Sequence, residues 1–100
     1  MNVPWIGLYE VRSLPGNDAL AGMAGAFVNV VALGKDVEDF KRTASGALRD
    51  YDFEVLTVAG IGTVEERGKR EDLVLALEQL AAFLTNDNPV QLDEFQAYEQ

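Results

Sequence analysis

The stretch Ala26-Phe27-Val28-Asn29-Val30-Val31-Ala32-Leu33 (residues 26–33) decides the fold. It is apolar at both alternating sets of positions, and Asn29 is its one polar residue. Because successive side chains of a strand point to opposite faces of a sheet, this pattern predicts a central strand that is covered on both faces. Such a strand needs neighbours on each side, and the flanking sequence provides candidates for them.

Two more strands and a helix are predicted around this stretch. Residues 5–12 are rich in aromatic and aliphatic side chains, and they end before Pro15-Gly16, a pair that suits a type II turn within a loop over 14–24. Asp36 is placed to cap a helix, and an apolar face follows it at helical spacing: Val37, Phe40, Ala44, Leu48 and Tyr51. Residues 53–59 predict a third strand, which ends at the glycines of 60–62.

A second helix and an acidic C-terminal segment complete the chain. Thr63 and Glu66 have the spacing of a capping box, so a short helical turn is expected there. Apolar residues then recur at helical spacing as far as the Asn86-Asp87-Asn88-Pro89 stop: Leu73, Val74, Leu77, Leu80, Ala81 and Leu84. Residues 85–100 contain acidic but no basic side chains, yet they include Phe95 and Tyr98. We therefore expect this segment to dock onto the rest of the molecule.

The elements thus follow the order ββαβα, with a possible short C-terminal strand. A strand-helix-strand unit implies a right-handed crossover, which makes the second and third strands run in the same direction. We expect an α+β fold, a two-layer sandwich of ferredoxin-like character with both helices on one face of the sheet. The length of 100 residues fits a single domain over residues 1–100, with residues 85–100 as its docked acidic segment.

The absence of both histidine and cysteine narrows the chemistry that this chain can perform. It removes the commonest general base, the commonest metal ligand and the thiolate nucleophile together. We expect no cofactor and no metal site, since the clusters of acidic residues match no calcium-loop pattern. What remains is catalysis by tyrosine, arginine, lysine, carboxylate or backbone groups, or no catalysis at all.

The net charge of −9 makes nucleic acid an improbable partner, because phosphate groups would be repelled. The chain shows neither an export signal nor an apolar run long enough to span a bilayer. We therefore expect a cytoplasmic protein that binds neither nucleic acid nor membrane. Its partner is expected to be a second copy of the chain or another protein.

Both faces of the predicted sheet are apolar, whereas helices on one side can cover only one of them. In the strand over residues 26–33, Val28 and Val30 point to one face of the sheet, and Phe27 and Val31 point to the other. A second layer of protein would have to cover the face that the helices leave open. We expect residues for binding a ligand or a partner at the aromatic and apolar positions Trp5, Tyr9, Val11, Phe27, Phe95 and Tyr98. Gly7, between Trp5 and Tyr9, is expected to leave a shallow recess if its face is uncovered.

The sequence therefore predicts a small acidic interaction or oligomerising module, without catalysis, that acts through the second face of its sheet. An alternative is a ligand-binding protein or enzyme with its cavity at a dimer interface, using groups such as Tyr9, Arg12, Tyr51 or Glu54. A further alternative is an acidic inhibitor or immunity-type protein that binds a basic partner through the acidic residues of the C-terminal segment: Asp87, Asp93, Glu94 and Glu99.

Overall fold

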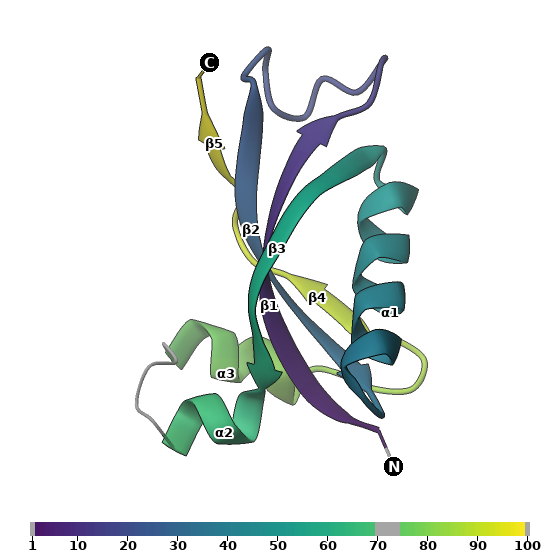
Figure 1. Ribbon diagram of the computed structural model, residues 1–100, viewed down its shortest axis with the longest axis vertical. Helices are drawn as coiled ribbons and strands as arrows, with labels where there is room; N and C mark the ends of the chain where they lie inside the picture. The colour runs from purple at the N-terminus through teal and green to yellow at the C-terminus, as the bar shows by residue number, and fades with distance from the viewer. Residues whose placement is uncertain (1, 70–74, 100) are drawn as a thin grey trace.

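The protein is an α+β fold built on one antiparallel sheet, and the computed structural model describes residues 2–69 and 75–99 (Figure 1). The strands are β1 (Val3–Ser13), β2 (Gly25–Gly34), β3 (Phe53–Thr63), β4 (Val90–Leu92) and β5 (Gln96–Tyr98). The helices are α1 (Val37–Asp50), α2 (Val64–Lys69) and α3 (Leu75–Ala82). The strand order is β3-β1-β2-β4, and β5 also pairs with β2.

β1 and β2 form a long antiparallel hairpin whose register places Tyr9 opposite Val28. The loop between them starts with the expected turn, because the amide of Asn17 donates to the carbonyl of Leu14 at 3.0 Å and Gly16 has a φ of +91°. A positive φ at the third turn position defines type II geometry and favours glycine. The side-chain amide of Asn17 also donates to the carbonyls of Tyr51 and Asp52, which ties this loop to the end of α1.

α1 begins where the sequence predicts it, with Asp36 as its cap. The Asp36 carboxylate accepts a hydrogen bond from the amide of Asp39 at 2.8 Å, and acidic side chains occupy the first turn. Both features stabilise the positive end of a helix. Phe40, Ala44 and Leu48 are fully buried against the sheet, which confirms the middle of the predicted apolar face, whereas Val37 and Tyr51 at the two ends of the helix are exposed.

The chain crosses from β2 through α1 to β3, and β3 lies on the far side of β1. Since β2 and β3 are both antiparallel to β1, they run in the same direction, as the strand-helix-strand pattern predicts. β3 extends to Thr63, beyond the predicted end at Ala59. The extension has a physical cause: the β1–β3 register shifts between Ile6 and Leu8, so the glycine-containing stretch stays in the sheet as a bulge.

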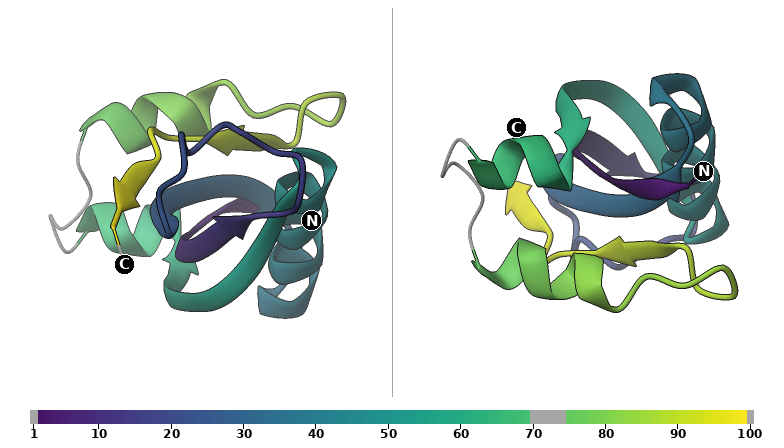
Figure 2. Two further views of the ribbon diagram at one scale, coloured as in Figure 1. Left: turned by 90° about the horizontal axis from the view of Figure 1, so that it is seen from above. Right: turned by 90° about the horizontal axis from the view of Figure 1, so that it is seen from below.

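The two longer helices cover opposite faces of the sheet, which corrects the expectation that both lie on one face (Figure 2). α3 packs Leu77 and Leu80 against Ile6 and Val31, which point away from α1. The α1 face has no room for a second helix, because Phe40 and its neighbours fill it together with apolar residues of the C-terminal segment. The expected helix residues Leu73 and Val74 lie outside the described residues.

The C-terminal segment runs along the outer edge of β2. β4 pairs with Val30–Ala32 and β5 with Gly25–Phe27, and both pairings are antiparallel. Between β4 and β5 the amide of Asp93 donates to the carbonyl of Asn29 at 3.0 Å. Directly before β2, the amide of Ala24 donates to the carbonyl of Tyr98, the last residue of β5, at 3.0 Å. Almost the whole length of β2 is therefore paired on both sides.

Candidate protein-interaction surface

The face of the sheet opposite α1, called the second face here, is only partly covered. In its middle, cross-strand pairing forms two rows of residues from β2, β1 and β3: Phe27–Glu10–Thr57 and Asn29–Leu8–Ala59. α3 covers the neighbouring row, so that Ile6 and Val31 are completely buried. The two middle rows lie beyond its reach.

Three large apolar side chains are exposed in and beside these rows. Leu8 is 38% exposed and Phe27 is 40% exposed, although their strands lie in the interior of the sheet. Leu56 is 42% exposed beside Thr57, at the register shift between Glu10 and Val11 where β3 carries an extra residue. We call Leu8, Phe27 and Leu56 the apolar patch. The register places Leu8 and Phe27 on neighbouring strands of this face, and contiguous exposed apolar surface marks sites of association.

Glu10 is the one charged residue of the two middle rows, and both of its carboxylate oxygens accept hydrogen bonds. The Tyr98 hydroxyl donates to Oε2 at 2.6 Å, and the Thr57 hydroxyl donates to Oε1 at 3.2 Å. The hydrogen bond to Glu10 raises the pKa of the Tyr98 phenol, and burial raises it further. Both donors are neutral, so the two carboxylate oxygens are satisfied as hydrogen-bond acceptors while the negative charge of Glu10 remains.

Two of the six sequence-predicted site residues meet on the second face. The rings of Phe27 and Tyr98 lie 5.5 Å apart between centroids, in a tilted arrangement. Tyr98 also lies directly over Gly25, where an added Cβ would be 2.5 Å from its hydroxyl oxygen. Gly25 is therefore required for the β5 tyrosine to reach Glu10.

The structure places Trp5, Tyr9 and Val11 under α1 and not on an open surface. Trp5 stacks on Phe40 and donates from Nε1 to the carbonyl of Gly34 at 2.9 Å, while Tyr9 and Val11 are buried. Phe40 fills the expected recess, since a Cβ on Gly7 would be 3.1 Å from its ring. Because α1 covers this face, the condition for a recess at Gly7 is not met, and these residues build the core.

Phe95, the remaining predicted residue, lies on the α1 side of the sheet, where it stacks on Phe53 with ring centroids 4.9 Å apart. Sequence reasoning did not select Leu8, Glu10 or Leu56. The alternation of residues 5–12 separates Leu8 from Tyr9, but only the register against β2 shows which set α1 covers. Leu56 depends on a bulge, for which the sequence gives no signal.

The groups considered for catalysis do not converge on one cavity of the described chain. Arg12 forms an ion pair with Glu54, whereas Tyr51 is 64% exposed at the end of α1. Tyr9 is buried near Ser45 without a partner of good hydrogen-bond geometry among the described residues, and burial raises the pKa of its phenol. This arrangement provides no nucleophile and base within reach of each other.

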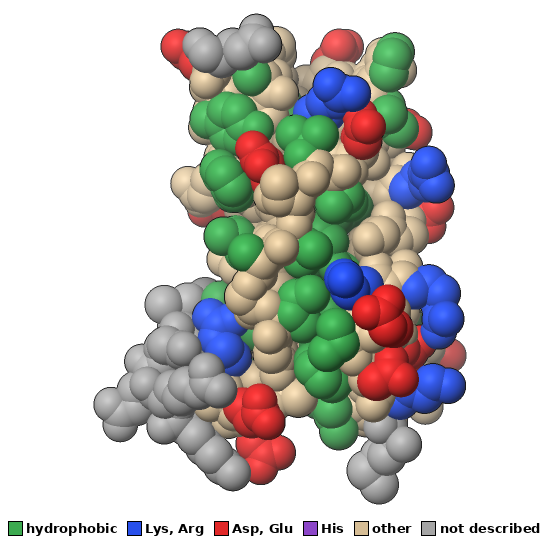
Figure 3. Space-filling model, in the orientation of Figure 1, with side chains coloured by type: hydrophobic (Ala, Val, Ile, Leu, Met, Phe, Trp, Pro, Cys, Tyr) green, Lys and Arg blue, Asp and Glu red, His purple; other side chains and the backbone are tan. Residues whose placement is uncertain are grey.

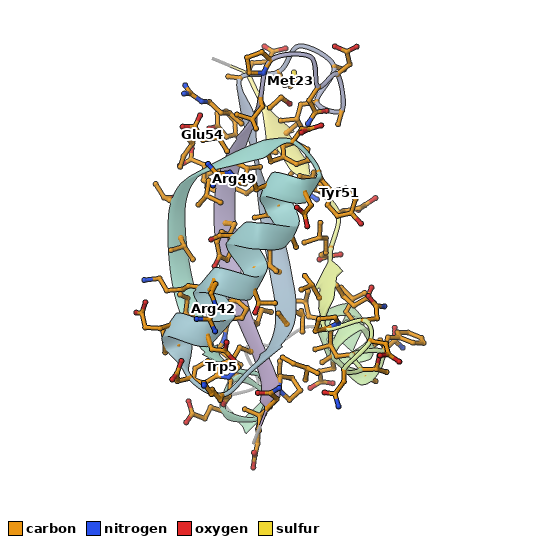
Figure 4. The ribbon with its side chains drawn as sticks, turned by 90° about the vertical axis from the view of Figure 1, so that its right-hand side faces the viewer. Trp5, Met23, Arg42, Arg49, Tyr51 and Glu54 are labelled. Carbon is orange, nitrogen blue, oxygen red and sulfur yellow. The ribbon has the colours of Figure 1, made fainter. Side chains whose placement is uncertain are left out.

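A groove of about 660 Å³ lies between α1 and β3, lined by Leu14, Arg42, Ser45, Gly46, Arg49, Phe53, Glu54 and Val55. In Figure 4 the arginines lie along α1 and Glu54 lies on the neighbouring strand. Arg42 is paired with Asp39, and Glu54 with Arg12. The groove is thus bordered mainly by charges that are already neutralised locally.

The acidic residues of the described chain form no cluster of three that could hold a metal ion. Within the C-terminal segment, Asp87, Glu94 and Glu99 are exposed, whereas Asp93 is half-buried between β4 and β5. They are distributed along the segment: one lies before β4, two lie between β4 and β5, and one follows β5. This spacing gives no particular support to the acidic-inhibitor alternative.

Comparison with protein-family models, curated proteins and solved structures finds no match to this chain. Among the described residues, no helix combines the length and the apolar character needed to cross a membrane.

Proposed function

We propose that this protein is a non-catalytic interaction module that forms a homodimer through the second face of its sheet. The observation that carries the proposal is the exposure of Leu8, Phe27 and Leu56 beside a row that α3 already covers. Leaving these side chains in water forgoes part of the stabilisation that burial of an apolar side chain provides, about 1.5–3 kcal/mol for each fully buried one.

The charge distribution favours a second copy on this face. Two chains of charge −9 repel each other, and the repulsion is weakest where each presents the fewest unpaired charges. The middle rows contain Glu10 alone, and its carboxylate is held by Tyr98 and Thr57. A two-fold axis over these rows would bring the same apolar patch from each copy together, as in the commonest form of homodimer.

The apolar patch would form only the centre of such an interface. A stable interface buries about 800 Å² on each partner, which three side chains do not provide. The uncharged neighbours Asn29, Thr57 and Ala59 extend the contact on either side of the patch. Central apolar anchors inside a polar rim are the usual anatomy of protein interfaces.

The experiment is light scattering after gel filtration. We expect twice the 10.9 kDa chain mass at micromolar concentration. Leu8→Lys and Phe27→Lys should each give a folded monomer, because they place a charge in the centre of the contact. Val37→Lys is the matched control, since Val37 is 39% exposed but lies at the start of α1.

A monomer at high micromolar concentration would overturn the homodimer. A dimer that is equally weakened by Val37→Lys and by Leu8→Lys would place the contact elsewhere. Circular dichroism of each variant distinguishes a loss of association from a loss of folding.

A further inference from the structure

β3 is a long edge strand with an open outer side. It covers Phe53–Thr63 and pairs with β1, and no other strand of the described chain pairs with it. In Figure 1 it lies at the front of the sheet, between α1 and the two shorter helices. An open edge presents unpaired backbone N–H and C=O groups, which are a template for another strand.

Residues 55–64, which make up most of β3, lack the charged residues and proline that usually protect an edge, although the two register shifts of β3 are themselves a protective feature. The chain has three runs of at least nine uncharged residues, at 1–9, 19–34 and 55–64. The first two runs supply most of β1 and β2, which are paired on both sides, whereas the third supplies β3. Proteins usually place lysine, other charges or proline on an exposed edge strand, and residues 55–64 contain none of them.

Charged side chains bound the uncharged part of this edge at both ends. At one end Arg67 of α2 donates from Nη1 to the carbonyl of Gly60 at 2.8 Å, and its side chain lies against Gly62. At the other end Glu54 forms a cross-strand ion pair with Arg12 of β1, and the uncharged stretch begins at the next residue, Val55. The open part is therefore Val55–Ala59, about 17 Å of strand. Figure 3 shows a column of hydrophobic side chains along this side of the molecule, with many of the charged groups beside it.

We propose that the outer edge of β3 binds an extended peptide segment of another protein, which adds to the sheet as a further strand. The segment would be uncharged over about five residues and rich in β-branched side chains, to match Val55–Ala59. Main-chain hydrogen bonds would provide the affinity, as in other cases of strand addition. The site is an edge and not a face, so it does not depend on the proposed homodimer.

A free peptide fits this edge better than a second copy of β3 does. The extra residue of β3, Leu56, lies inside the open part, where the pairing with β1 is already irregular. Two copies related by a two-fold axis would each present this irregularity to the other, whereas an unstructured peptide can adjust its backbone to it.

The test uses a blocked hexapeptide of alternating threonine and valine as the probe. Its binding to the Phe27→Lys variant is followed through backbone amide shifts in nuclear magnetic resonance spectra. The Phe27→Lys substitution disrupts any dimer that forms through the second face, so peptide binding at the β3 edge is measured on its own. We expect shifts and slower amide exchange at Val55–Ala59 as the peptide is added.

Two N-methylated analogues of the peptide provide the decisive comparison. In each analogue every second backbone amide is methylated, at the odd-numbered residues in one analogue and at the even-numbered residues in the other. Since successive N–H groups of a strand point to opposite edges, only one analogue loses the N–H groups that face β3. We expect one analogue to bind about tenfold or more weakly and the other to bind like the parent, because only one loses its hydrogen bonds to the protein. Equal binding of both analogues, or no shift at Val55–Ala59, overturns the proposal.

A second variant tests the closed end of the edge. Arg67→Ala uncovers the Gly60 carbonyl, so the peptide should bind about two- to tenfold more tightly, as expected for one added hydrogen bond. Lys41→Ala removes a positive charge from α1 and should leave peptide binding unchanged. If Arg67→Ala instead makes the Phe27→Lys protein dimerise while the peptide still fails to bind, the occupant is a second copy and the peptide proposal is wrong.

Discussion

The two faces of the sheet are made by the same strands but are closed to different extents. On the α1 face, Tyr9, Val28 and Val30 are buried beneath Phe40 and its helix. On the second face, Leu8 and Phe27 from the same two strands keep more than a third of their surface in water. α1 and the C-terminal segment together cover the core residues of one face, whereas α3 covers only one end of the other face.

The difference follows from the order of the elements. α1 connects β2 to β3 across β1, so its 14 residues lie over the centre of the sheet. α3 follows β3 and α2 at the end of the sheet, and its eight described residues, 75–82, pack against Ile6 and Val31. The position of a helix in the chain thus decides which apolar rows stay open for a partner.

The largest effect is expected from removing the C-terminal segment, which contributes to both faces. A chain that ends at Pro89 loses Val90, Leu92 and Phe95 from the α1 face and Tyr98 from the second face. It also leaves one edge of β2 unpaired. Burial of Phe95 alone is worth about 1.5–3 kcal/mol, so the free energy of unfolding should fall by about 3–6 kcal/mol in urea. An unchanged urea midpoint would mean that the segment does not dock in solution.

Alanine substitutions of one phenylalanine on each face compare the faces directly. Phe40→Ala removes a fully buried ring that packs on Gly7, Trp5 and Tyr9, and should lower the free energy of unfolding by about 3–5 kcal/mol. Phe27→Ala removes a ring that is 40% exposed, and should cost about 1 kcal/mol or less in the monomer. Urea unfolding of both variants at low protein concentration measures this difference. Equal losses would show that the second face is closed in the monomer.

The comparison of faces also shows where sequence reasoning stops. The alternation of residues 5–12 and 26–33 separates the apolar sets of each strand, and helical spacing predicts α1 and its cap Asp36 correctly. The sequence does not say which set of β1 shares a face with which set of β2. A two-residue turn would fix that register, but the connection between Ser13 and Gly25 is a long loop.

The helix placement and the patch were beyond prediction for a related reason. Leu77 and Leu80 form an apolar side on α3, but an apolar side fits either face of a sheet equally well. α3 packs on the second face because Phe40, Phe95 and their neighbours already fill the α1 face. The exposure of Leu8 depends on where α3 ends. It is therefore a property of the complete fold and cannot be predicted from a local sequence pattern.

A smaller effect is expected from alkaline pH, which acts on one phenol of each face. The pKa values of Tyr9 and Tyr98 are both raised above the ordinary value of 10.0, the first by burial and the second by its hydrogen bond to Glu10. Folding therefore favours the neutral phenols, and their contribution to stability is complete below pH 10 and is lost as the pH rises through the folded-state values. The melting temperature should fall above pH 10.

Tyr98→Phe separates the two contributions. This variant lacks the group that ionises beside Glu10, so its melting temperature should fall less steeply above pH 10 than that of the parent protein. At neutral pH it should be slightly less stable, since the Glu10 carboxylate loses a hydrogen-bond donor. An identical alkaline slope in the two proteins would show that the second-face phenol does not contribute.

The smallest effect is expected at Gly46, on the outer side of the helix that closes the first face. A Cβ there would meet no atom within 4 Å, and the residue lies in the interior of α1. Gly46→Ala should raise the free energy of unfolding by about 0.5–1 kcal/mol, because alanine loses less backbone entropy on forming a helix. Dimer affinity measured by light scattering should stay the same, since the second face lies on the other side of the sheet. A weaker dimer would show that the outer surface of α1 also takes part in assembly, and the second face would then not be the whole interface.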